Sequence, residues 1–317
     1  MRRIELTVEP EGSFPVPTAN GYQIYGAILS ALDGVDEDVS TRVHDSSIGS
    51  LTNSGLLGTF DGSQRDHHKR VIRDETYALK LGVADPRDQE VFQALADAFV
   101  FSDDTLELAD GDFRVRDFAS TNTTHEDLLT EASEIAARNH DTFEIKVRFE
   151  TPTCIKENEN ITNMFPARQH VFASILRKWN ATIPDERADE FEIAMTREDF
   201  GTNLIEKPDA DTYETDSVLV NRGEDGGPIL RQGFTADCTY KFKDASEAVR
   251  TAVTALALFS EYAGVGAFVS RGCGTVSVEV EKFDRGNTDV RYHIDLGRSG
   301  PSTRPRGVPR RPRPSPS

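Results

Sequence analysis

The sequence predicts an α+β protein in which two β-α-β-β-α-β units follow one another along the chain. Three observations support this class. Several short segments alternate hydrophobic and polar residues, which is typical of strands with one wet side. Other segments place hydrophobic residues three and four positions apart, as on one face of a helix. The two kinds of segment follow the same order in each half of the chain.

The first half opens with a strand at residues 2–9, where Ile4, Leu6 and Val8 fall on one face. Residues 20–32 then change to helical spacing. Further elements complete the order β-α-β-β-α-β, the ferredoxin-like split unit. They are strands at 57–61 and 70–83, a helix from Pro86 to about Val100, and strands near 104–108 and 112–118.

The second half begins after the polar, turn-prone segment 119–127, where we place the domain boundary. Asp244 is expected to cap a helix that carries Val253, Leu256 and Phe259, because Glu247 lies three residues on. The other expected elements are helices at 125–138, 166–179 and 184–196, strands at 142–150 and 275–281, and a strand or hairpin at 229–243. The predicted domains are 1–120 and 121–297, followed by a basic Pro/Arg tail at 298–317 that we expect to be disordered.

The composition is strongly acidic for a chain of 317 residues. Asp and Glu number 54 against 36 Lys and Arg, for a net charge of −18, and only nine of the basic residues are lysines. Such a balance suggests a halophilic protein, because a Debye length of roughly 3 Å in 1 M salt screens the self-repulsion. In such salt, counterion release contributes little to binding, so acidity is a weak argument against a nucleic-acid partner.

The cysteines and the apolar segments bear on the compartment. Cys154, Cys238 and Cys273 form no C-x-x-C pair, which argues against a zinc site or a disulfide framework and favours reduced thiols. The N-terminus has no apolar signal core, and no apolar run approaches the ~18 residues of a membrane span. We therefore expect a soluble, cytoplasmic protein without membrane contact.

A glycine-rich stretch lies between the last predicted helix and strand, with glycines at 264, 266, 272 and 274. It is not a dinucleotide fingerprint, because Val269 occupies a required glycine position and the stretch runs from helix to strand. A Walker loop is excluded because no Gly-Lys-Ser/Thr occurs. Two interpretations remain open. One is an anion-binding turn whose N–H groups work with Arg271; the other is a helix cap at Gly264 with a bulge at Gly272.

The stretch GVGAFVSRGCGTV (264–276) resembles the C-terminal glycine-rich loop of the RAMP superfamily, and most closely that of the CRISPR repeat-processing endoribonucleases. Three other segments are similar to the same family. GYQIYGAIL (21–29) resembles its first helix, VHDS to LTNSGLL (43–57) its histidine-bearing segment, and TPT to Trp179-Asn180 (151–180) the start of its second half. The resemblance spans about residues 2–283 and implies tandem ferredoxin-like, RRM-like domains. The resemblance is to a haloarchaeal, type I-B-like member of the family, which is consistent with the acidic composition.

The resemblance also implies a reaction. Members of this family cut CRISPR repeat RNA without metal or cofactor: the ribose 2′-OH attacks the adjacent phosphate and leaves a 2′,3′-cyclic phosphate and a 5′-OH. His44 matches the position of the family's catalytic histidine, whereas without the resemblance it would pass for a solvated histidine in a polar loop. No lysine precedes Lys69, so the groups that assist His44 stay open. The expected RNA-binding residues are Gly264, Gly266, Arg271, Gly272 and Gly274.

The expected partners are CRISPR precursor RNA and other subunits of a CRISPR surveillance complex. Two alternatives remain. The chain could be a non-catalytic RNA-binding subunit of such a complex, which would share the fold and the glycine loop but need no histidine. It could also be an unrelated α+β metabolic enzyme, which no cofactor motif supports. The basic tail is either an arm that touches RNA or a solubilising extension.

Overall fold

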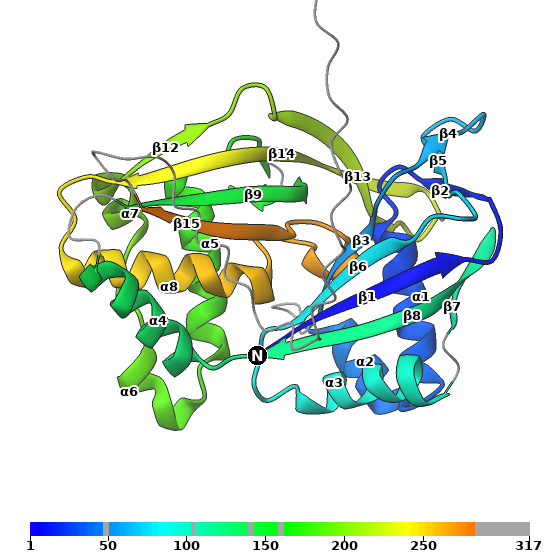
Figure 1. Cartoon of the computed structure of the whole chain (residues 1–317), viewed down its shortest axis with the longest axis horizontal. Coiled ribbons are helices and arrows are strands. Elements are labelled where there is room, and N and C mark those ends of the chain that lie inside the picture. The colour runs from blue at the N-terminus through cyan, green and yellow to red at the C-terminus, as the bar shows by residue number, and fades with distance from the viewer. Residues whose placement is uncertain (47–50, 103–104, 139–142, 158–161, 283–317) are drawn as a thin grey trace, which may run out of the picture.

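The computed structural model describes residues 1–46, 51–102, 105–138, 143–157 and 162–282. Two antiparallel sheets dominate it, and each is covered by helices on one side (Figure 1). Each half has its own hydrophobic core. The tail predicted for 298–317 lies outside the described residues.

The first sheet has the strand order β3-β6-β1-β8-β7, and all its pairs are antiparallel. Ile4, Leu6 and Val8 of the central strand are fully buried, as their alternation predicts. A small sheet, β2-β5-β4, projects beside it. The strands are β1 (Arg2–Pro10), β2 (Pro15–Pro17), β3 (Thr52–Leu57), β4 (Asp61–Gly62), β5 (His68–Arg70), β6 (Tyr77–Val83), β7 (Thr105–Leu108) and β8 (Gly111–Asn122). The helices are α1 (Gly21–Asp33), α2 (Glu37–Asp45), α3 (Gln89–Ala96) and the π-helical turn η1 (Asp97–Ser102).

The second sheet has the order β12-β14-β9-β15, with β13 paired to β14. Its helices gather on one side (Figure 1). The strands are β9 (Phe143–Thr153), β10 (Ile155–Lys156), β11 (Thr162–Asn163), β12 (Leu204–Pro208), β13 (Glu214–Arg222), β14 (Pro228–Phe242) and β15 (Val276–Lys282). The helices are α4 (His125–Arg138), α5 (Arg168–Thr182), α6 (Ala188–Phe191), α7 (Arg197–Asn203) and α8 (Glu247–Ala263), with short turns η2 (Asp185–Arg187) and η3 (Val269–Arg271). In both sheets the first strand of the unit lies between its third and fourth, so the predicted tandem ferredoxin-like fold is confirmed.

Two predicted elements of the chain are wrong. The strand expected at 57–61 lies earlier, as β3, and Gly55 within it has a positive φ of 65°. The helix expected at 184–196 is only η2 and α6. Beyond α6, the side-chain amide of Asn180 bonds both the N–H and the carbonyl of Ile193, at 3.2 and 3.3 Å, which holds that backbone in an irregular path.

The predicted cap of α8 is also displaced. Ser246, not Asp244, is the N-cap, and its hydroxyl accepts from the Val249 N–H at 3.3 Å. Asp244 has a φ of 52°, in the left-handed region that aspartate tolerates, so it serves the turn that precedes the helix. Serine and aspartate are both good caps, and the pattern of charges alone did not separate them.

The two halves meet along β6, β9 and α8. The Lys80 ammonium on β6 donates to both carboxylate oxygens of Glu150 on β9, at 2.8 and 2.7 Å. Arg3 on β1 pairs with Glu261 on α8 at 3.1 Å. These ion pairs and the glycine-rich stretch join the halves over one cleft. No helix in the part of the chain that the structure describes is long and apolar enough to cross a membrane.

Candidate RNA interface and active site

The glycine loop, residues 264–275, runs from the end of α8 to β15 and docks on the first half of the chain. Gly264 ends α8 with a φ of 62° and donates to the Ser260 carbonyl, so it is the helix cap that one interpretation predicted. Gly266, Gly272 and Gly274 also have positive φ, at 79°, 88° and 69°. An L-residue with a side chain would pay about 1–2 kcal/mol at each of these positions.

A second reason for glycine at these positions is that the loop backbone lies very close to the backbone of other segments. A Cβ on Gly266 would lie 2.5 Å from the Cys154 carbonyl oxygen, and one on Gly272 would lie 2.4 Å from the Cα of Gly21. Cys154 and Gly21 come from the second and first halves respectively. The glycines therefore let the loop lie in the narrow space between the two halves.

Most of the loop's glycine amides already have partners. Gly264 donates to Ser260, Gly266 to the Ser174 hydroxyl at 2.9 Å, and Gly274 to the Pro152 carbonyl at 3.2 Å. Among the described residues, the N–H of Gly272 has no hydrogen-bond partner. Among the glycines of this loop, the geometry thus leaves the amide of Gly272, next to Arg271, able to meet an anion.

Arg271 connects the loop to the first half. Its Nη1 donates to the Val220 carbonyl of β13 at 2.7 Å, and its guanidinium carbon lies 5.8 Å from the centre of the Tyr25 ring. Burial raises the pKa of Tyr25 above its usual value. The positive charge of Arg271 offsets part of this rise, and the negative charge of Asp45 adds to it. Arg271 of the loop thus faces Tyr25 of α1, and α2, whose last residue is Asp45, packs against the same helix.

His44 precedes Asp45 in the last turn of α2 and is exposed. The expectation that it lies in a loop is wrong, because the Asp36 side chain accepts from the N–H groups of Asp38 and Val39 and starts a helix there. The His44 ring makes no hydrogen bond to another described residue and is open to solvent. Its helix, α2, packs against α1, which carries the tyrosine that Arg271 faces.

Asn53 is a site residue that the sequence did not single out. It is fully buried on β3, and its amide nitrogen donates to the Ser270 carbonyl of the loop and to the Gly21 carbonyl of α1. Its amide oxygen accepts from Gly55 at 2.8 Å. One side chain thus ties the loop to the start of α1. The available signal was a lone asparagine in the segment LTNSGLL, but nothing in the sequence pairs it with residue 270.

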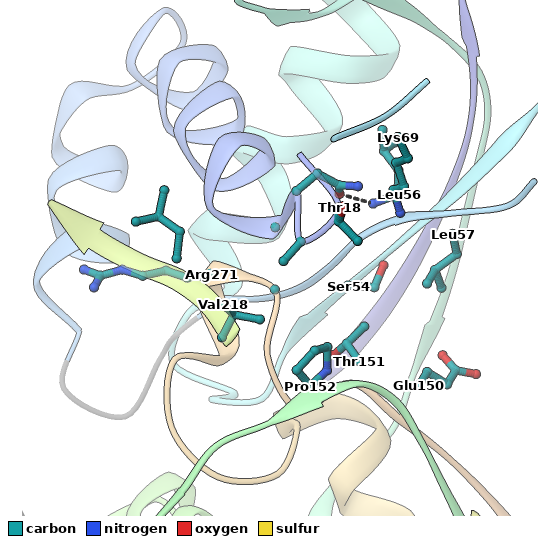
Figure 2. A pocket seen from close by; sticks show the side chains of 15 residues that line it. Thr18, Ser54, Leu56, Leu57, Lys69, Glu150, Thr151, Pro152, Val218 and Arg271 are labelled. Atoms are coloured by element: carbon teal, nitrogen blue, oxygen red, sulfur yellow. Dashed lines mark hydrogen bonds between the residues drawn. The ribbon is translucent and has the colours of Figure 1, made fainter. Parts of the chain in front are cut away.

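A cavity of about 120 Å³ lies between the halves beside the loop (Figure 2). Arg271 and Gly272 line one side, and Lys69, Ser54 and Thr151 contribute polar groups from other elements. Burial lowers the pKa of Lys69 to about 8, and its ammonium lies 3.6 Å from the centre of the Phe60 ring. The lining therefore combines cationic residues, hydroxyl groups and one carboxylate residue, Glu150, with apolar walls.

The described residues do not gather three or more His, Cys, Asp or Glu side chains in a group that could hold a metal ion. His67 and His68 lie on the projecting hairpin, where His67 has a φ of 59° and the His68 ring contacts the Asp66 carbonyl. The chemistry that the site offers is thus hydrogen bonding, positive charge and an exposed imidazole.

Comparison with known proteins agrees with this arrangement. Residues 147–276 match the model of the family described as CRISPR-associated endoribonuclease Cas6. A search of curated proteins finds no match. Among solved structures, a product complex of Cas6 from Thermus thermophilus is 19% identical with a TM-score of 0.63, covering 87% of this chain and 98% of that one.

Two further solved structures have the same fold. A RAMP protein that binds different RNA substrates is 14% identical with a TM-score of 0.56, covering 88% of this chain and 99% of that one. A Cas6-related protein from Pyrococcus furiosus is 12% identical with a TM-score of 0.55, covering 87% and 97%. The resemblance to CRISPR-associated endoribonucleases is thereby confirmed: residues 147–276, which include the glycine loop, match the Cas6 family model, and the chain as a whole has the fold of solved Cas6 structures.

Proposed function

We propose that this chain is an endoribonuclease that cleaves CRISPR repeat RNA to mature guide RNA without a metal ion. The observation that carries the proposal is the packing of the glycine loop, with Arg271, against α1, with Tyr25. The helix α2, whose last turn carries the proposed catalytic His44, packs against the same α1. The family match over 147–276 supports the substrate class, since it covers the loop itself.

The proposed reaction is an internal transesterification. The ribose 2′-oxygen attacks the neighbouring phosphorus as its proton leaves to a base, and the bond from phosphorus to the 5′-oxygen breaks as that oxygen gains a proton. The products are a 2′,3′-cyclic phosphate and a 5′-OH. The His44 ring is exposed and has no hydrogen-bond partner among the described residues, so it can accept or donate one of these protons. General acid or base catalysis of this kind raises the rate by a factor of roughly 10²–10⁴.

Arg271 and the free N–H of Gly272 are proposed to hold the RNA phosphate backbone, with Gly264, Gly266 and Gly274 giving the loop its shape. Charged hydrogen bonds of this kind stabilise the negative charge that grows on phosphorus. The two predicted domains, 1–120 and 121–297, would then act as one unit, because the histidine comes from the first and the loop from the second.

The test is cleavage of repeat RNA by purified protein in EDTA and molar KCl. We expect wild type to cut, and His44→Ala to lose at least about 100-fold in rate while it still binds RNA. His170→Ala, a histidine on α5 that bonds Arg197 instead, is the matched control and should cut normally. Full activity in His44→Ala would remove His44 from the mechanism, and dependence on added metal would refute the metal-free reaction.

A second candidate is a non-catalytic RNA-binding subunit of a CRISPR surveillance complex. The observation that favours it is that most glycine amides of the loop bond other parts of the chain. Such amides fix the shape of the loop and do not take part in a cleavage reaction. RNA that is protected at high salt but never cut, with identical behaviour of His44→Ala, would support this function in place of the first. Association with other subunits of such a complex fits either function.

A further inference from the structure

Lys178 of α5 is a charged residue in the interior of the second half, with only 4% of its surface exposed. No carboxylate pairs with it among the described residues. Its ammonium instead donates to the carbonyl oxygens of Ala263 and Gly264, at 2.8 and 3.0 Å. A lone buried cation is costly unless its protons are used. These carbonyls lie at the C-terminal end of α8, where the helix dipole favours positive charge.

Ser174 lies four residues before Lys178 on the same helix and so on the same face. Its hydroxyl accepts from the Gly266 N–H at 2.9 Å. Lys178 therefore holds the carbonyls at 263 and 264, and Ser174 holds the amide two residues later. We call these two side chains the α5 clamp. It grips the segment where the chain leaves α8 and becomes the glycine loop.

The position of this segment sets the direction of the rest of the loop. The next residue, Ala267, donates to the Cys154 carbonyl at 2.8 Å. Further along, Asn53 bonds the Ser270 carbonyl through its side chain and accepts from the Thr275 hydroxyl, at the far end of the loop, through its own carbonyl at 3.4 Å. Arg271 and Gly272 lie between Ser270 and Thr275, the two loop residues that bond Asn53. If the clamp were released, this segment would keep only backbone bonds: the Gly264 cap, the bond from the Val265 N–H to the Gly274 carbonyl at 2.8 Å, and the bond from Ala267 to Cys154.

We propose that Lys178 and Ser174 are positioning residues that preorganise the glycine loop for RNA, so that their loss weakens RNA binding while the cleavage step is kept. The inference rests on the proposed function. The physical reason is entropic. Without the clamp the loop is less ordered in the free protein, and the free energy needed to order it when RNA binds lowers the affinity for RNA. The clamp does not touch His44, which lies on α2 in the other half. Burial also lowers the pKa of Lys178 to about 7, in accordance with a dry site.

The first experiment needs no RNA. Amide hydrogen exchange over residues 264–274 is measured for wild type, Lys178→Met and Ser174→Ala in molar KCl. The control is Ile175→Ala, which removes a core side chain of the same helix that is 2% exposed. Each variant is measured at the same interval below its own melting temperature. Under these conditions we expect amide exchange in the loop to be at least tenfold faster in both clamp variants than in the control. Equal protection in wild type and the clamp variants would overturn the proposal.

The second experiment separates binding from chemistry. Single-turnover cleavage is followed against enzyme concentration, which gives a half-saturating concentration and a maximal rate. We expect the clamp variants to raise the former about tenfold and to keep the latter within about twofold, whereas Ile175→Ala changes neither. A lower maximal rate at unchanged half-saturation, or an equal rise in the control, would contradict a positioning role.

The outcomes distinguish the two proposals. If wild type neither binds nor cuts repeat RNA, the proposed function fails, and the exchange experiment still decides whether the clamp orders the loop. If wild type cuts normally and the clamp variants behave like wild type in both experiments, the clamp inference alone fails. Ser174→Ala keeps the test valid should Lys178→Met not fold, because it removes only one hydroxyl.

Discussion

Gly21 at the start of α1 and Gly272 in the glycine loop lie back to back, each filling the space that a side chain on the other would need. A Cβ on Gly21 would lie 2.2 Å from the Cα of Gly272 and 2.7 Å from the carbonyl oxygen of Arg271. The neighbours are backbone atoms, which cannot swing aside. This contact joins the first helix of one half to the glycine loop of the other.

Gly21→Ala should therefore push the loop away from α1. We expect a loss of about 1–3 kcal/mol in the free energy of unfolding, the usual range for overpacking, together with weaker RNA binding. Gly26→Ala on the same helix is the matched control, since a Cβ there meets nothing within 4 Å. The control should gain up to about 1 kcal/mol from helix propensity. Urea unfolding in molar KCl measures both, and equal stability of the two variants would show that the contact does not form.

Arg271→Lys tests the fork geometry of the guanidinium. Lysine keeps the charge but cannot bond the Val220 carbonyl and face an RNA phosphate with a planar pair of donors. A charged hydrogen bond is worth about 1.5–3 kcal/mol, so RNA affinity should fall about 10- to 100-fold. Arg222→Lys, whose guanidinium bonds the Gly226 carbonyl on the exposed hairpin, should bind as wild type does. Filter binding at several KCl concentrations is a suitable measurement, and unchanged affinity in Arg271→Lys would exclude a direct contact.

The fold could be predicted where hydrophobic periodicity is strong. The alternation at 2–9 and 142–150 predicts β1 and β9, the central strands of the two sheets, because both bury one face on a core. The prediction was wrong where tertiary hydrogen bonds replace local ones. Asn180 holds Ile193 out of the expected helix, and no local pattern reveals that pairing.

The site could be predicted in part. Spacing excluded the cofactor loops at 264–274, and the family resemblance pointed to His44 and Arg271. The sequence could not show which glycine amides are already bonded, because their partners Ser174 and Pro152 lie on distant elements. Asn53 and Lys178 were missed for the same reason: their importance comes from partners far along the chain, at 270 and at 263–264.

The ion pair between Lys80 and Glu150 should stabilise the contact of the two halves. Both side chains are mostly buried, at 25% and 16% exposed, so the pair is screened less than a surface pair. A double-mutant cycle with Lys80→Met and Glu150→Gln should give a coupling of about 1 kcal/mol that persists in molar KCl. The exposed pair of Glu134 and Arg138 on α4 is the control, where a coupling of about 0.3–0.5 kcal/mol should vanish in that salt. Equal couplings in the two cycles would mean that Lys80 and Glu150 are as solvated as a surface pair.

His125 should make the stability of the second half depend on acid pH. It is buried at the start of α4, its Nε2 lies 3.2 Å from the Thr182 hydroxyl, and its ring packs against the edge of Trp179. Burial lowers its pKa from 6.5 to about 4. Between these values the unfolded chain binds a proton that the folded chain does not, so stability is full above pH 6.5 and declines as pH falls toward 4.

The expected loss from this histidine is about 2 kcal/mol between pH 7 and pH 5, at 1.36 kcal/mol for each pKa unit. Urea unfolding at the two pH values measures it, and His125→Gln should remove the histidine's share of the decline while it can still bond Thr182. His67→Gln, which replaces an exposed histidine on the hairpin, should leave the decline as in wild type. If His125→Gln loses stability with falling pH as steeply as wild type does, the buried imidazole is not the group that titrates.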